Sequence, residues 1–149
     1  MKLADVRAIK KKDGIIMYKN LLDEAAKARE ESYCRYSGFA VGAALLCSDG
    51  EIFTGCNIEN LSYSLTNCAE RTAIFKAVSE GKTDFTAIAV VGAVKSGDCL
   101  SEKCFPCGAC LQVMTEFCDP GFKIILAENG EPKVFCLSDL MPNIFNSSF

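Results

Sequence analysis

Two short segments contain the residue types that can bind a metal and transfer protons. The first is Cys68-Ala69-Glu70, and the second is Cys107-Gly108-Ala109-Cys110. The spacing of Cys107 and Cys110 places two thiols one helical turn apart, facing the same way. On its own this pair is consistent with a redox pair, with half of a zinc site, or with coincidence in a chain that has ten cysteines.

Cys68 also lies where a helix is expected to start, so three thiols would meet at two helix N-termini. The positive end of a helix dipole stabilises a thiolate. Catalytic zinc has three protein ligands and leaves its fourth position for water. Cys68, Cys107 and Cys110 therefore form a plausible three-ligand zinc site, and Glu70 follows Cys68 closely enough to reach a water there without binding the metal.

Histidine is absent from the sequence. This removes the most common general base and the most common metal ligand. Any metal must then be held by thiolate or carboxylate groups, and a carboxylate such as Glu70 is a natural proton carrier. The alternative interpretation of Glu70 is a helix capping box with Asn67, three residues earlier.

The composition favours one folded domain with a small-molecule partner. Of the 149 residues, 50% are hydrophobic and 23% are charged, which argues against disorder. The net charge is −3, and the only basic cluster is Lys10-Lys11-Lys12, without interleaved aromatic residues. We therefore expect no nucleic-acid partner, and a ligand that is uncharged or weakly charged.

The N-terminal residues carry several charges and no apolar core segment, so no signal peptide is expected. No apolar run approaches the roughly 18–20 residues that span a membrane. We therefore expect a cytoplasmic protein with reduced thiols and no membrane partner. Five further cysteines have apolar surroundings or lie at the edges of predicted elements, and we interpret them as small hydrophobic residues: Cys34, Cys47, Cys56, Cys118 and Cys136.

The hydrophobic pattern predicts one sheet with helices packed on it. Turn signals lie at Asp13-Gly14, Ser48-Asp49-Gly50 and Asn129-Gly130. The predicted helices span about 15–30, 68–80 and 107–117, with a last helical turn at 138–141. The predicted strands span 39–46, 51–55, 86–91, 122–127 and 134–137, and residues 1–13 form a lead-in.

Four segments together resemble the small, homotetrameric, zinc-dependent cytidine deaminases of the cytidine and deoxycytidylate deaminase superfamily. They are Tyr36–Leu45, Gly55–Asn60, Asn67–Ala73 and Pro106–Cys110. The likeness extends from about Gly14 to Phe145. It implies a single α/β domain over residues 1–149, with a three-layer fold in which helices cover both faces of a mixed five-stranded sheet.

The resemblance also implies an activity. The expected reaction is the zinc-dependent hydrolytic deamination of cytidine, and of deoxycytidine, to uridine or deoxyuridine and ammonia in pyrimidine salvage. One Zn²⁺ per chain and a homotetramer are implied as well.

Roles carry over from the family to matching positions of this sequence. Cys68, Cys107 and Cys110 match the zinc ligands, and Glu70 matches the proton shuttle. Asn57 and Glu59 match the pair that binds the ribose 3′-hydroxyl, Phe39 matches the ring that packs on the base, and the backbone of Ala69 matches a group that hydrogen-bonds to the pyrimidine. Tyr63 and Phe145 match residues that reach the pocket of a neighbouring subunit. Arg71 matches the arginine that donates to the ligand sulfurs.

These roles are physically reasonable for a nucleoside. An amide and a carboxylate suit sugar hydroxyls, and the charge of Glu59 would repel the phosphate of a nucleotide. Without the resemblance, Asn57 and Glu59 would be interpreted as a polar turn after a strand.

The sequence departs from the family at a few positions. Leu111 stands where an arginine usually follows the last zinc ligand, which leaves Arg71 and the helix dipoles to offset the thiolate charge. The segment 92–105 is longer than usual and carries Cys99 and Cys104, interpreted as bystanders. Two alternatives remain: a deaminase of the blasticidin S type, and a non-catalytic module whose structural zinc is closed by a fourth cysteine such as Cys104.

Overall fold

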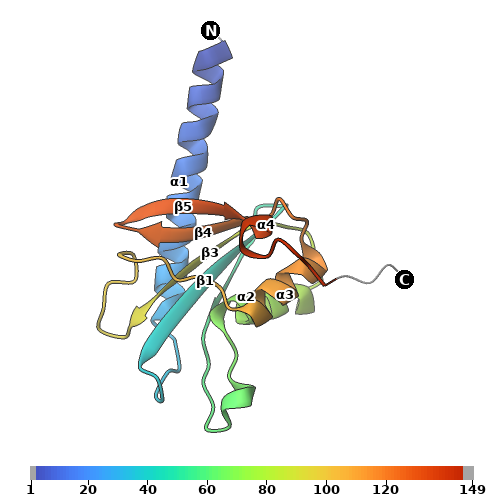
Figure 1. Cartoon of the computed structure of the whole chain (residues 1–149). Coiled ribbons are helices and arrows are strands. Elements are labelled where there is room, and N and C mark those ends of the chain that lie inside the picture. Colours follow the sequence, from blue (N-terminus) through green and yellow to red (C-terminus); the bar gives the residue numbers. More distant parts are fainter. Residues whose placement is uncertain (1–2, 146–149) are drawn as a thin grey trace.

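Five strands form one mixed sheet in the order β2-β1-β3-β4-β5 (Figure 1). The computed structural model describes residues 3–145. The strands are β1 (Phe39–Cys47), β2 (Ile52–Cys56), β3 (Phe85–Val94), β4 (Lys123–Glu128) and β5 (Glu131–Cys136). Strands β3 and β4 pair in parallel, and the other neighbours pair antiparallel. The predicted mixed five-stranded sheet is confirmed.

Helices cover both faces of this sheet (Figure 1). Helix α1 (Leu3–Arg29) packs on one face, and helices α2 (Ala69–Ser79) and α3 (Gly108–Phe117) pack on the other, beside the short α4 (Leu137–Leu140). Each face therefore has its own apolar cluster. Strand β3 lies between the two clusters and is buried along most of its length, as its continuous apolar run predicts.

Helix α1 starts much earlier than the sequence pattern predicts. It runs without a break from Leu3, so the expected turn at Asp13-Gly14 is wrong. A glycine within a helix costs only about 1 kcal/mol relative to alanine. The neighbouring lysines, alanines and leucines favour a helix strongly enough to continue through Gly14.

The two hairpin turns form where they are predicted. Asn129 and Gly130 join β4 to β5 with φ values of 51° and 76°, as a two-residue hairpin turn requires. Gly50 has a φ of 91° in the turn between β1 and β2. These turns fix the register of both edge strands, because loop length and turn type set the pairing.

A buried arginine ties the end of α1 to the sheet. Arg29 is 5% exposed; its Nε donates to the carbonyl of Ala40 at 3.0 Å, and its Nη2 to that of Val94 at 2.6 Å. These carbonyls lie near the start of β1 and the end of β3. The arginine therefore anchors the end of the sheet where Phe39 is located.

Two glycines allow the helices to pack closely on the β1–β2 hairpin: Gly42 faces α1, and Gly55 faces α2. A Cβ atom at Gly42 would lie 1.9 Å from the carbonyl oxygen of Ala25 in α1. A Cβ atom at Gly55 would lie 2.5 Å from the carbonyl oxygen of Ala69 and 2.5 Å from the backbone nitrogen of Ala73. The backbone of the first turn of α2 thus packs directly against the backbone of β2.

Within the described residues, no helix combines the length and the apolar character needed to cross a membrane.

Gly55→Ala should displace the first turn of α2, because the added methyl group collides with backbone atoms. Overpacking of this kind costs about 1–3 kcal/mol. We expect a lower free energy of unfolding in urea and a lower zinc content of the purified protein.

Gly14→Ala is the matched control, since Gly14 is helical and, among the described residues outside its own helix turn, none comes within 4 Å of its Cβ position. It should leave both quantities unchanged or raise the stability slightly. Equal stability of Gly55→Ala and wild type would contradict the proposed seating of α2 on β2.

Candidate metal centre and active site

Three cysteine sulfurs meet where α2 and α3 begin. The Sγ atoms of Cys68, Cys107 and Cys110 all lie within 4.8 Å of one another, and those of Cys68 and Cys107 are 3.8 Å apart. Cys68 is the N-cap residue of α2, Cys107 is the N-cap residue of α3, and Cys110 lies in the first turn of α3. The predicted meeting of three thiols at two helix starts is confirmed.

The donor set fits zinc. Thiolates bind zinc at about 2.3 Å, and a tetrahedral arrangement separates two such sulfurs by about 3.8 Å. That is the separation of Cys68 and Cys107. Among the side chains that the structure describes, this is the one group of three or more metal-type ligands, and Cys104 is not part of it. A three-ligand site is therefore favoured over a closed four-cysteine site.

The site carries donors that favour negative charge on sulfur. Arg71 donates from Nη2 to the Sγ atom of Cys68 at 3.3 Å. A hydrogen bond from Cys110, with further contributions from Arg71 and Cys107, lowers the pKa of Cys68 to about 5. The N-termini of α2 and α3 add the positive ends of their dipoles.

Leu111 stands where the family usually has an arginine, so Arg71 is the arginine that contacts the sulfurs here. Leu111 is 8% exposed and packs in the apolar cluster beneath α2 and α3. The Nε atom of Arg71 is buried and has no hydrogen-bond partner within the described residues.

Glu70 is buried beside the cysteine cluster. It lies in the first turn of α2 and is 3% exposed. Burial raises the pKa of its carboxyl group, and the charge of Cys68 adds to this effect. The alternative capping-box interpretation is wrong, because Cys68 is the N-cap residue and the Asn67 amide donates to Thr72 instead.

Asn57 holds the start of β1 through its side chain. Its Oδ1 accepts hydrogen bonds from the backbone N–H of Val41, at 2.9 Å, and from the hydroxyl of Ser32. Its Nδ2 donates to the carbonyl of Phe39 at 2.8 Å. The amide is therefore tied to the strand that carries the ring expected to pack on the base.

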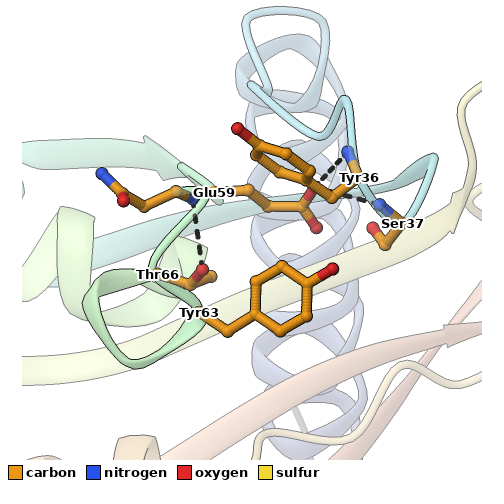
Figure 2. A pocket seen from close by; sticks show the side chains of 6 residues that line it. Tyr36, Ser37, Glu59, Tyr63 and Thr66 are labelled. Atoms are coloured by element: carbon orange, nitrogen blue, oxygen red, sulfur yellow. Dashed lines mark hydrogen bonds between the residues drawn. The ribbon is translucent and has the colours of Figure 1, made fainter.

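Glu59 organises the neighbouring loop (Figure 2). Its Oε1 accepts hydrogen bonds from the backbone N–H groups of Tyr36, at 2.9 Å, and Ser37, at 3.1 Å. Hydrogen bonding to Ser37 and Tyr36 lowers the pKa of Glu59, so the carboxylate is charged at neutral pH. Asn57 and Glu59 thus hold two consecutive segments, the start of β1 and the loop before it.

A cavity of about 240 Å³ lies beside Glu59 (Figure 2). Tyr36 and Tyr63 form part of its wall, with ring centroids 6.0 Å apart in an edge-to-face arrangement. The three cysteines do not line this cavity. The wall of this cavity is formed by the Glu59 loop and the segment before β1.

Phe39 lines a second cavity, of about 350 Å³, together with Cys104 and the backbone that follows β3. Cys104 Sγ and Phe39 Cε1 both press on Gly92, since a Cβ atom there would lie 2.6 Å from the sulfur and 3.0 Å from the ring. Burial, followed by the charges of Glu70 and Cys68, raises the pKa of Cys104 to about 11. Cys104 is thus a neutral thiol that shares the surroundings of Gly92 with Phe39.

The other residues expected to contact substrate differ in how exposed they are. Ala69 is fully buried at the start of α2. Tyr63 and Phe145 are 73% and 81% exposed, so neither is covered by its own chain. Cys104 lies outside the ligand group, as its interpretation as a bystander expects, whereas the sequence pattern did not predict the contact of Ser32 with Asn57. Nothing in the sequence pattern singles out Ser32.

The segment between β3 and α3 is held by contacts with the turn between β4 and β5. The backbone N–H groups of Asn129 and Gly130 donate to the carbonyls of Ser101 and Leu100, each at 2.9 Å. Lys103 forms an ion pair with Glu128. These contacts tie the longer loop to the β4–β5 turn and so hold the chain just before Cys107.

Fold and site together define a class: α/β proteins with a thiol-lined zinc centre at the starts of two helices. The model of the cytidine and deoxycytidylate deaminase zinc-binding region matches residues 16–126. This chain belongs to that family.

Individual relatives are similar over most of their length. A cytidine deaminase of Halalkalibacterium halodurans is 50% identical over 128 residues, which cover 85% of this chain and 92% of the relative. One from Sporosarcina psychrophila is 48% identical, with 85% and 89% covered. The crystal structure of cytidine deaminase from Burkholderia pseudomallei aligns with a TM-score of 0.75 and 46% identity, covering 85% of this chain and 97% of that one.

Single replacements of Cys68, Cys107 or Cys110 by serine should each remove most of the zinc, because a hydroxyl is a poor substitute for a thiolate ligand. Wild type should hold about one zinc per chain. The measurement is metal content by elemental analysis after gel filtration.

Cys104→Ser is the matched control and should keep its zinc, because Cys104 is not part of the three-sulfur group. Loss of zinc from Cys104→Ser, at a level equal to the ligand variants, would support a closed four-cysteine site instead.

Proposed function

We propose that this chain catalyses the hydrolytic deamination of cytidine to uridine and ammonia. The observation that carries the proposal is the buried carboxylate of Glu70 beside a three-sulfur zinc site in a member of this deaminase family. The relatives that are about half identical to this chain are cytidine deaminases. A structural zinc would not need a buried acid at its side.

Cys68, Cys107 and Cys110 would hold the zinc. When bound, zinc supplies a Lewis acid that lowers the pKa of water toward neutrality. Glu70 accepts a proton from the attacking water and delivers it to N3 of the pyrimidine. The C4–O bond forms, and Glu70 then takes the proton of the new C4 hydroxyl and passes it to the amino group. The C4–N bond breaks, ammonia leaves, and the C4 carbonyl of uridine forms. Arg71 offsets the negative charge of the sulfurs.

The substrate side of the proposal rests on the two segments held by Asn57 and Glu59. Phe39 packs on the base, the backbone of Ala69 reads the pyrimidine, and Asn57 with Glu59 binds the sugar hydroxyls. Glu59 is charged at neutral pH, so it repels a substrate phosphate. The preferred substrate is therefore a nucleoside, with deoxycytidine accepted beside cytidine.

We further propose that the chain forms one deaminase domain and that four copies of it assemble into a homotetramer. The enzyme would act in pyrimidine salvage in the cytoplasm. Large apolar side chains are exposed around the loop that contains Tyr63: Leu61, Tyr63 and Leu65 are 77%, 73% and 68% exposed. Exposed apolar patches of this kind mark protein interfaces. A second copy would cover them and bring its own Tyr63 or Phe145 toward a neighbouring pocket.

Glu70→Gln should nearly abolish turnover, because the amide cannot carry the proton. Proton transfer by a positioned side chain contributes about 10²–10⁴ in rate. Zinc content should stay at the wild-type value, since Glu70 is not a ligand. Steady-state assays and metal analysis of the same preparation test both statements.

Glu116→Gln changes an exposed glutamate of α3 and is the matched control with wild-type rate. Near-normal activity of Glu70→Gln would refute the proton-carrier role.

A substrate panel separates the nucleoside deaminase from its alternative. Loss of the ultraviolet absorbance of the substrate should be seen with cytidine and deoxycytidine. Cytidine monophosphate should react poorly, because its phosphate meets the charge of Glu59, and blasticidin S should be inert. Turnover of blasticidin S but not of cytidine would establish the other type of deaminase.

A further inference from the structure

The side chain of Asn57 has almost all of its hydrogen-bonding positions occupied within the chain. An amide offers two N–H donors and one oxygen with two lone pairs. The oxygen accepts from Val41 N–H and from the Ser32 hydroxyl, while one N–H donates to the carbonyl of Phe39. Among the described residues the second N–H of Nδ2 has no partner, so this position is available to a ligand.

Ser32 makes the contact that completes this arrangement. It is 6% exposed and lies three residues after the end of α1, where its backbone N–H still donates to Arg29 at 3.0 Å. Its hydroxyl reaches Asn57 Oδ1, and the neighbouring Tyr33 N–H donates to the backbone carbonyl of Asn57 at 3.0 Å. Residues 32–33 therefore hold both the side chain and the backbone of Asn57.

The Val41 contact alone would leave the amide less constrained. Asn57 is only 9% exposed, so water cannot readily replace a missing donor at Oδ1. A buried oxygen that loses one of two partners can tilt toward another donor. Because Nδ2 is bonded to the Phe39 carbonyl, a tilt of the amide would move its free N–H.

We propose that Ser32 is a positioning residue that fixes the Asn57 amide, so that its remaining N–H is presented to the sugar hydroxyl of the substrate. The inference rests on the proposed function and adds one residue to it. Ser32 is 6% exposed, and its hydroxyl bonds to Asn57 rather than to a residue of the metal centre. Its hydroxyl acts through Asn57 on substrate binding, and the chemical step at Glu70 is unaffected.

Ser32→Ala should raise KM for cytidine about 3- to 10-fold, the effect of one hydrogen bond, with kcat unchanged. Ser32→Thr keeps the hydroxyl and should restore KM toward wild type. Ser79→Ala removes a hydroxyl that bonds only to the Lys76 carbonyl at the end of α2, and it should behave as wild type. Melting temperatures check that each variant is folded.

The decisive comparison uses 2′,3′-dideoxycytidine, which lacks the sugar hydroxyls that Asn57 would bind. With this substrate, wild type and Ser32→Ala should have the same kcat/KM. Ser32→Ala should also have no further effect in an Asn57→Ala background. An equal loss on cytidine and dideoxycytidine, or an additional loss in the double variant, would show a general structural role and overturn the inference.

Failure of the inference is separable from failure of the proposed function. If wild type does not turn over cytidine, the proposed function falls, and the role of Ser32 falls with it. If wild type turns over cytidine and Ser32→Ala matches it in KM, only the role of Ser32 is refuted.

Discussion

Three sulfur atoms within 4.8 Å of one another can share a site as thiolates only if positive charge offsets their mutual repulsion. The fold provides this charge in two ways. The N-termini of α2 and α3, with the positive ends of their dipoles, both lie at the cysteine cluster, and Arg71 donates a hydrogen bond to Cys68. The geometry depends in turn on how closely α2 lies on β2, which the absence of a side chain at Gly55 permits. A zinc ion held there would add the largest positive charge.

The substrate side is built by a second, separate network. Asn57 and Glu59 bond to backbone groups at the start of β1 and in the loop before it, and Ser32 links this network to the end of α1. Arg29 anchors the same end of the sheet from α1. The helix on the far face of the sheet therefore positions residues that would contact the sugar, although it lies across the sheet from the metal centre (Figure 1).

The sequence predicted the sheet, the helices that carry the ligands, and the three-sulfur cluster, because each follows from local periodicity and short spacing. It misplaced the start of α1, since the cost of one glycine is small beside the helix preference of its neighbours. It also started the second helix at Cys68, whereas Cys68 is the N-cap residue and α2 begins at Ala69. The contact of Ser32 with Asn57 joins segments far apart in the chain, which no local pattern reveals.

In the function that we propose, cytidine deamination depends on zinc held by these three cysteines, with Glu70 moving the protons. The most direct measurement is ammonia release from cytidine during titration of metal-free protein with zinc. We expect no turnover without zinc, a rate that rises linearly with added zinc, and saturation at one zinc per chain. Turnover by the metal-free protein, or a fully loaded protein that releases no ammonia, would contradict it.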